Sequence, residues 1–167
     1  PNDTYTRIAT SNAVTVSAAI NKLAISVSQN IIAGTPGFSM VVESRSPSGV
    51  ATNVSSNTAI TVSVKTGTGT LGGTFSGTIL AGTSQVMIGL ATYTKAESGV
   101  VLTAARTSGD TLIAGDTAPF TVSPGAAARL AFTTQPGTAA AKSTIPGPPT
   151  VTLHDGKGNT VTTSIQS

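Results

Sequence analysis

The sequence contains no cysteine and no tryptophan, and only 9% of its residues are charged, against roughly 25% in an average soluble domain. Without cysteine, a disulfide framework and thiolate metal sites are excluded. No stretch approaches the 18 or more consecutive apolar residues of a transmembrane helix, so no membrane span is expected in this window. Aromatic residues make up only 4% of the chain, which leaves few rings for a sugar-binding platform.

The small charge that is present has no strong pattern. Nine Lys and Arg residues stand against six Asp and Glu residues, for a net charge of +3. The cations are scattered singly along the chain, whereas a phosphate-binding surface needs several of them close together. The sequence therefore does not predict a nucleic-acid partner.

Thr, Ser, Val, Ala and Gly take the place of the missing residue types, and apolar and small polar residues alternate. Leu23, Ile25 and Val27, for example, are separated by Ala24 and Ser26. A period of two is typical of strands with one buried face, and no segment shows the helical period. Strands are predicted at residues 5–9, 13–17, 23–28, 38–44, 59–65, 75–80, 86–93, 100–104 and 117–122, with a short resumption at 50–54.

The predicted strands are separated by short turn signals, such as Ser46-Pro47-Ser48-Gly49, Ala81-Gly82-Thr83 and Glu97-Ser98-Gly99. Residues 66–74 form a longer loop rich in Gly and Thr. Short strands at even spacing indicate an antiparallel β-sandwich. The predicted fold class is therefore all-β, an immunoglobulin-like antiparallel β-sandwich repeated in tandem.

An internal repeat supports the tandem arrangement. Residues 13–17 match residues 118–123, and Val16 and Val122 are 106 positions apart. Residues 22–26 match residues 129–133, and Leu23 and Leu130 are 107 positions apart. A period of this size corresponds to one sandwich domain.

The repeat predicts the domain boundaries. Residues 1–20 are expected to be tail strands of a preceding repeat or a donated strand, and residues 21–127 one complete domain. Residues 128–167 are expected to be the first strands of the next repeat. Because the chain begins Pro1-Asn2-Asp3-Thr4, it is expected to be processed or a fragment.

The last third of the chain carries a family resemblance. Its residues are Leu130-Ala131-Phe132-Thr133-Thr134-Gln135-Pro136, followed by Thr150-Val151-Thr152-Leu153-His154-Asp155-Gly156-Lys157-Gly158-Asn159-Thr160-Val161. They resemble the bacterial immunoglobulin-like tandem repeats of large surface proteins, invasin/intimin-type adhesins and extracellular filaments. That family opens with an L-x-F-x-x-Q-P strand and has a D-x-x-G-N turn after its second strand, which Asp155, Gly158 and Asn159 match. The complete domain departs from the pattern: Ile25 replaces the Phe, and Ser46-Pro47-Ser48-Gly49 replaces the acidic turn. The resemblance implies a surface role and no active site.

Three motifs contain residue types that occur at sites of chemistry. His154 and Asp155 are neighbours, but adjacent strand residues point to opposite faces, so a hydrolase triad is not expected. Residues 155–159 contain only one carboxylate, together with a lysine. Because Ca²⁺ takes six to eight oxygen ligands, this is a poor ligand set for a Ca²⁺ site. Residues 67–73 are Gly-rich but lack the Gly-Lys-Ser/Thr ending of a phosphate loop. No catalytic, cofactor-binding or metal-binding residue is predicted, and no cofactor.

The six aromatic residues are interpreted mainly as core residues, with Phe75, Phe120 and Phe132 inward by alternation. A Lys–Asn crosslink is a further hypothesis, for which the sequence has no specific signature.

The leading hypothesis is a non-enzymatic, extracellular or cell-surface structural protein whose partners are copies of itself or adjacent repeats, joined end to end or by β-strand addition. The alternatives are a module that binds carbohydrate or a receptor, and an accessory domain of a secreted hydrolase.

Overall fold

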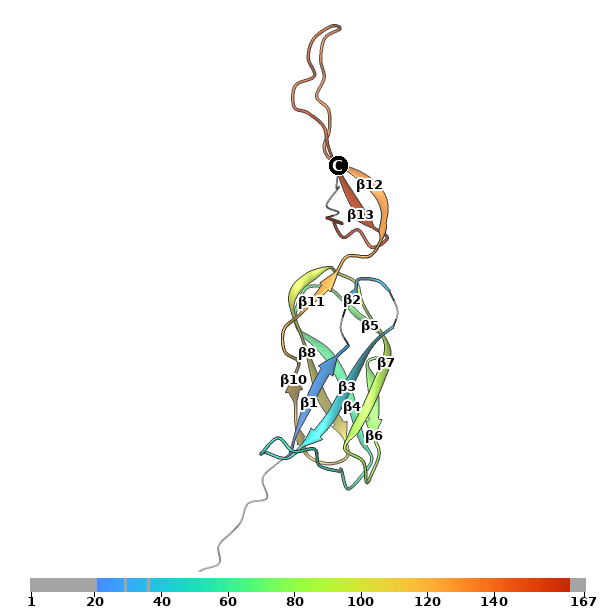
Figure 1. Ribbon diagram of the computed structural model, residues 1–167, viewed down its shortest axis with the longest axis vertical. Coiled ribbons are helices and arrows are strands. Elements are labelled where there is room, and N and C mark those ends of the chain that lie inside the picture. The colour runs from blue at the N-terminus through green and yellow to red at the C-terminus, as the bar shows by residue number, and fades with distance from the viewer. Residues whose placement is uncertain (1–20, 29, 36, 163–167) are drawn as a thin grey trace, which may run out of the picture.

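The structure is a computed structural model that describes residues 21–28, 30–35 and 37–162. These residues form thirteen β-strands and no helix (Figure 1), so the expected all-β class is confirmed. The strands predicted at residues 5–9 and 13–17 lie outside the described residues. The described strands fall into a body, residues 21–123, and a terminal hairpin that follows it.

The body consists of two sheets. The first has five strands, in the order β5 (Leu71–Gly73), β7 (Gln85–Tyr93), β3 (Phe38–Arg45), β1 (Asn21–Val27) and β9 (Leu112–Ile113). The second has six strands: β2 (Ile31–Ile32), β11 (Phe120–Ser123), β8 (Glu97–Ser108), β4 (Thr58–Thr66) and β6 (Ser76–Ile79) in order, with β10 (Gly115–Asp116) on β8. Most neighbours are antiparallel, but β1 pairs with β9 and β2 with β11 in parallel.

One hydrophobic core is shared by both sheets of the body. The strands alternate as their sequences require, since every second side chain of a strand points to the same face. On β3, for example, Phe38, Met40 and Val42 are buried while the residues between them are partly exposed. The second sheet contributes residues such as Ile60 and Leu102, which are 1% and 0% exposed. Burial of these apolar side chains is the main source of stability for the body.

The chain changes sheets between β1 and β2, the first two described strands. β1 pairs with β3 in the first sheet, whereas β2, a few residues later, pairs with β11 in the second. Asn30, between the two, has a φ of 60°, a left-handed conformation that Asn adopts more readily than most residues. The change of sheet brings Ile31 into the core, where it is 3% exposed.

Several predicted boundaries are wrong. The predicted separator at Glu97 to Gly99 is the beginning of β8, since Glu97 pairs with Val122 of β11. The predicted loop at 66–74 contains β5, and here the chain passes from the second sheet to the first, as a strand-switching loop does. The strand predicted at 117–122 begins only at Phe120. The predicted resumption at 50–54 is reduced to a single bridge between Ala51 and Arg45.

The prediction that the aromatic residues face inward is wrong for Phe75 and Phe132. Phe75 and Phe132 are 42% and 57% exposed, and Phe120 is half-buried against the core. Phe75 lies in the link between β5 and β6, where strand alternation does not apply. For Phe38 and Tyr93 the interpretation as core residues is confirmed, since they are 7% and 1% exposed.

The terminal hairpin consists of β12 (Ala127–Thr134) and β13 (Thr150–Asp155), which pair only with each other among the described residues. Residues 135–149 connect them and extend away from the body (Figure 1). A tight turn of residues 155–159 follows β13 and lies beside the end of the body formed by β2 and β11. We call residues 155–159 the docking turn.

Candidate functional site

The carboxylate of Asp155 is the centre of the contact between the terminal hairpin and the body. Asp155 is 1% exposed, yet the residues around it in the chain are polar or glycine. Its Oδ1 accepts hydrogen bonds from the backbone N–H groups of Lys157 and Asn159, both at 2.8 Å. Its Oδ2 accepts from Nδ2 of Asn159 and from the backbone N–H of Gly125 in the linker after β11, both at 2.9 Å.

These four donors keep Asp155 ionised. Burial alone would raise the pKa of Asp155, but the hydrogen bonds from Asn159, Gly125 and Lys157 outweigh it and hold the pKa far below its usual range. A carboxylate that accepts several N–H groups has its charged form stabilised in this way. The charge therefore holds the docking turn closed and holds it against the linker.

Asn159 makes the second contact with the body. Its Oδ1 accepts a hydrogen bond of 2.9 Å from the backbone N–H of Ala96, and its Nδ2 donates one of 3.1 Å to the backbone carbonyl of Thr94. Thr94 and Ala96 belong to the connection between β7 and β8. The linker group that binds Asp155 and the two body groups that bind Asn159 are thus all main-chain groups.

Lys157 packs on the same end of the body. A Cβ atom placed on Gly34 would lie 2.5 Å from Cγ of Lys157, so the stem of the lysine occupies the space that a side chain would take. An open hollow of about 240 Å³ lies here, lined by the segment from Ala33 to Thr35, by Gly125 and Ala126, and by the docking turn. The contact between hairpin and body thus includes aliphatic packing beside the polar groups.

The connection that Asn159 binds is held in place by hydrogen bonds at its two ends. Tyr93 donates a hydrogen bond of 2.7 Å to Oε1 of Glu97. Glu97 also accepts from the backbone N–H groups of Thr68 and Gly69, at 2.8 and 3.0 Å. The hydrogen bonds from Tyr93 and Thr68 lower the pKa of Glu97 to about 2, and burial together with the bond to Glu97 raises the pKa of Tyr93 to about 12. This network could not be predicted from the sequence, because it joins the ends of β7 and β8 to a loop up to 29 positions earlier in the chain.

A second turn in the body has the same backbone hydrogen bonds as the docking turn. We call residues 46–50 the body turn; it follows β3 as the docking turn follows β13. In the body turn, Gly49 N–H donates to Ser46 O and Ser46 N–H to Val50 O, both at 2.8 Å. In the docking turn, Gly158 N–H donates to Asp155 O at 3.1 Å and Asp155 N–H to Asn159 O at 2.9 Å.

The correspondence extends to both sides of the turns. The bridge between Arg45 and Ala51 recurs between His154 and Thr160, and each residue lies 109 positions after its counterpart (154 minus 45, 160 minus 51). Both turns place a glycine at the fourth position with a φ near +90°, 89° for Gly49 and 90° for Gly158, a conformation that other residues rarely adopt. The hairpin of β12 and β13 is therefore a structural counterpart of the hairpin of β1 and β3.

His154 and Asp155 do not form a catalytic pair. Nδ1 of His154 lies 2.9 Å from the carbonyl oxygen of Gly158, while the carboxylate of Asp155 faces Gly125 and Asn159. The docking turn does not fit a Ca²⁺ site either, because the carboxylate oxygens already face N–H donors, which would repel a cation. Among the described residues, no three His, Cys, Asp or Glu side chains gather where they could hold a metal ion.

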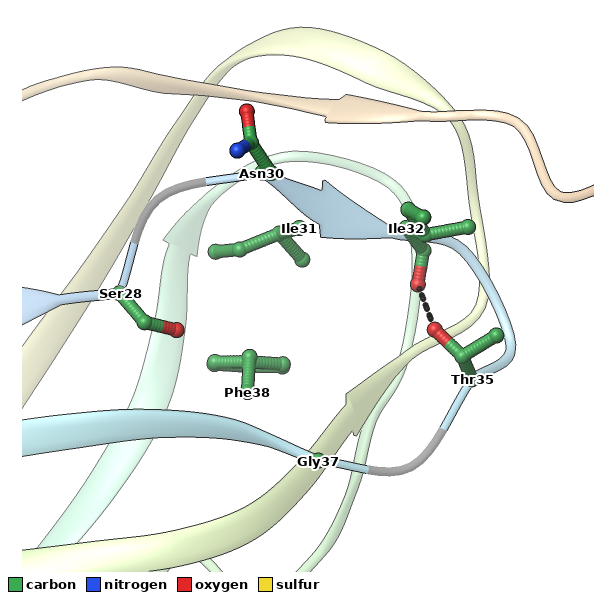
Figure 2. A pocket seen from close by; sticks show the side chains of 7 residues that line it. All are labelled: Ser28, Asn30, Ile31, Ile32, Thr35, Gly37 and Phe38. Carbon is green, nitrogen blue, oxygen red and sulfur yellow. Dashed lines mark hydrogen bonds between the residues drawn. The ribbon is translucent and has the colours of Figure 1, made fainter.

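A small cavity opens where the chain changes sheets between β1 and β2 (Figure 2). Its volume is about 160 Å³. The side chains of Ile31 and Phe38 point into it, whereas Asn30 points away. Two hydroxyl groups line the cavity, and each forms a hydrogen bond within the protein. Thr35 donates to the carbonyl of Ile32 at 2.9 Å, and Ser28 accepts from the N–H of Ser39 at 3.2 Å. The described residues that line the cavity thus offer no converging set of free polar groups to a ligand.

Comparisons with known proteins add no assignment. Scans against protein-family models, curated proteins and solved structures found no match to this chain. In the part of the chain that the structure describes, no helix is long and apolar enough to cross a membrane.

Proposed function

We propose that this chain is part of a non-enzymatic structural protein of a bacterial surface, in which immunoglobulin-like β-sandwiches follow one another in tandem. Residues 21–127 are one complete domain and residues 128–167 contain the first strands of the next. Such an array serves as an extracellular fibre, a stalk or the shaft of an adhesin. Its partners are adjacent repeats and copies of itself.

The observation that carries the proposal is the recurrence of the first hairpin at the end of the chain. The pairing of Leu23 with Ser44 in the body recurs as the pairing of Leu130 with Leu153. Two consecutive copies of one hairpin, each followed by the same turn, are expected when a domain is duplicated along the chain.

The exposure of the terminal hairpin supports the same interpretation. Leu130, Phe132 and Val151 are 68%, 57% and 50% exposed, whereas their counterparts Leu23, Ile25 and Val42 are 2%, 7% and 0% exposed. In the body these positions are covered by the second sheet. Three large apolar side chains on one face are costly to leave in water, so this face is suited to a second sheet that follows.

A variant of the proposal has the missing strands supplied by a neighbouring chain. An exposed sheet edge accepts an added strand through main-chain hydrogen bonds, and residues 5–17 are the candidate donor because residues 13–17 match residues 118–123. Deletion of residues 1–20 is expected to abolish polymerisation and leave the body folded. Fibres that still form after the deletion would contradict strand donation.

Direct imaging of the native material tests the proposal as a whole. We expect extended particles with a domain-sized repeat along their length. Discrete globular monomers, or a parent chain dominated by an attached catalytic domain, would contradict it.

A further inference from the structure

We propose that Asp155 and Asn159 fix the orientation of a domain on the domain before it by binding main-chain groups of that preceding domain. The inference rests on the proposed function for its biological meaning, since it concerns successive domains. The contacts themselves are properties of this chain and can be tested in it directly.

The first step is the geometry of the contacts. The two side chains bind two groups of the body, the N–H of Ala96 and the carbonyl of Thr94, and one group of the linker, the N–H of Gly125. Gly125 lies in the linker after β11, while Thr94 and Ala96 lie in the connection between β7 and β8. Because the contacts fall on two separate connections, rotation of the hairpin about the linker would break at least one set of hydrogen bonds.

Second, the part of the body that binds Asn159 is held by hydrogen bonds within the body. Glu97 follows Ala96 directly and is bound by Tyr93 and by the loop before β5. The backbone N–H of Gly34, on the same end of the body, donates to the carbonyl of Tyr93 at 2.8 Å. The groups that bind Asn159 are therefore held in place before the docking turn meets them, which lowers the entropy lost on contact.

The third step is the comparison with the body turn, which folds without these two residues. Ser46 stands at the position of Asp155, and its hydroxyl accepts a hydrogen bond of 3.2 Å from the N–H of Val50. Val50 stands at the position of Asn159, is 64% exposed and carries no polar side-chain atom. A turn with these backbone hydrogen bonds thus forms without Asp and Asn at the two positions; Asp155 and Asn159 add hydrogen bonds within the docking turn and the contact across the boundary.

The comparison also predicts that the two boundaries of the body differ. A domain before residue 21 would meet the body turn, which offers a serine already used within the turn and an apolar valine. That boundary would bend freely, whereas the boundary at Gly125 is held at one angle. The two turns share their backbone hydrogen bonds and the glycine at the fourth position, and we infer that Asp155 and Asn159 are the residues that make one boundary stiff and leave the other flexible.

The test uses the full chain, whose lack of cysteine allows two spin labels to be placed cleanly. We choose Met87→Cys on the outer face of β7, where Met87 is 72% exposed, and Gln135→Cys after β12. Pulsed electron spin resonance then measures the distance distribution between body and hairpin. Into this background we introduce Asp155→Ser with Asn159→Val, which gives the docking turn the residues of the body turn at these two positions. The matched control is Ser46→Asp with Val50→Asn, the reverse exchange at the other end of the body.

We expect one narrow peak for the labelled chain and for the control, and loss of the narrow peak in Asp155→Ser/Asn159→Val. Amide exchange at Asp155 and Val161, which donate the hydrogen bonds of the turn and of its flank, shows whether the hairpin is still folded. A narrow, unshifted peak in the double variant would overturn the proposal. So would loss of amide protection in the turn together with the peak, because the residues would then hold the hairpin itself. Neither result depends on whether the parent forms fibres.

Discussion

Tyr93 and Glu97 form a hydrogen bond of 2.7 Å between the end of β7 and the beginning of β8. Tyr93 is 1% exposed, and the only polar atom of its side chain is directed at the carboxylate. The phenol also accepts a hydrogen bond of 3.0 Å from the N–H of Gly69. The pair thus joins the connection between β7 and β8 to the loop that switches sheets, and both side chains have shifted pKa values as a result.

The stability of the body is expected to fall at both extremes of pH through this pair. The pKa of Glu97 is lowered from 4.5 to about 2, so its contribution is present above pH 4.5 and is lost as the pH falls towards 2. The pKa of Tyr93 is raised from 10.0 to about 12, so its contribution is present below pH 10 and is lost as the pH rises towards 12. Urea unfolding across these ranges measures both limbs.

Glu97→Gln separates this pair from the other carboxyl groups. We expect a loss on the order of 1 to 2 kcal/mol at pH 7, since the hydrogen bonds to a charged acceptor are weakened. The variant should also show a shallower decline than the wild type between pH 4.5 and 2. Tyr93→Phe removes the donor that lowers the pKa of Glu97 most, so the acid limb should move to higher pH. Acid limbs that superpose on that of the wild type would contradict the assignment.

Ser44→Ala is expected to stabilise the body by about 1 kcal/mol. Ser44 is 0% exposed, and its hydroxyl is a buried polar atom without a hydrogen-bond partner among the described residues. Its counterpart in the terminal hairpin is the apolar Leu153. Ser26→Ala, on the exposed side of β1, is the control and should change the free energy of unfolding little. A destabilised Ser44→Ala would indicate that the hydroxyl is bonded in solution.

Gly115→Ala is expected to destabilise the body by about 2 to 3 kcal/mol. A Cβ atom on Gly115 would overlap the carbonyl oxygen of Leu23, and backbone on both sides prevents relief of the clash. Gly89→Ala on β7 is the control, because a Cβ there meets no atom within 4 Å. Thermal unfolding of the two variants should differ clearly, and equal midpoints would contradict the close approach of β10 to β1.

The protein is expected to be more stable with asparagine than with leucine at position 90. Its φ of 60° lies in the left-handed region, which costs a leucine roughly 1 to 2 kcal/mol, and its side chain is 66% exposed. Leu90→Asn is therefore expected to stabilise by about 0.5 to 1 kcal/mol, whereas the β-branched Leu90→Val should destabilise. The order Asn, Leu, Val in urea midpoints is the expected result, and the reverse order would contradict the strained conformation.

The sequence predicted β3, β4 and β7 well because alternation reports burial directly, whereas β8, predicted at 100–104, extends from Glu97 to Ser108. β3, β4 and β7 each lie within about two residues of their predicted ranges. β2, β9 and β10 have two residues each, too few to show a period. Glu97 to Gly99 was misread because a glycine beside polar residues also marks turns, whereas Gly99 here lies within β8 with a φ of 75°.

The site was only half predictable. The sequence singled out Asp155, Gly158 and Asn159 as a turn, and the structure places them in one. Their partners could not be predicted, since Asn159 binds the main chain of Thr94 and Ala96, 65 and 63 positions away. Backbone N–H and carbonyl groups are present at nearly every residue, so no residue type marks the places where they are used.

Main-chain recognition by the docking turn has a consequence for how such a boundary would change in evolution. Gly125, Ala96 and Thr94 contribute backbone atoms, so most substitutions at these positions leave the hydrogen-bonding groups in place; proline at 96 or 125 is the exception, because it has no N–H. Asp155 and Asn159 have no such freedom. Constraint would therefore fall on one side of the boundary, and a search for covarying pairs across it would return no signal although the contact is specific.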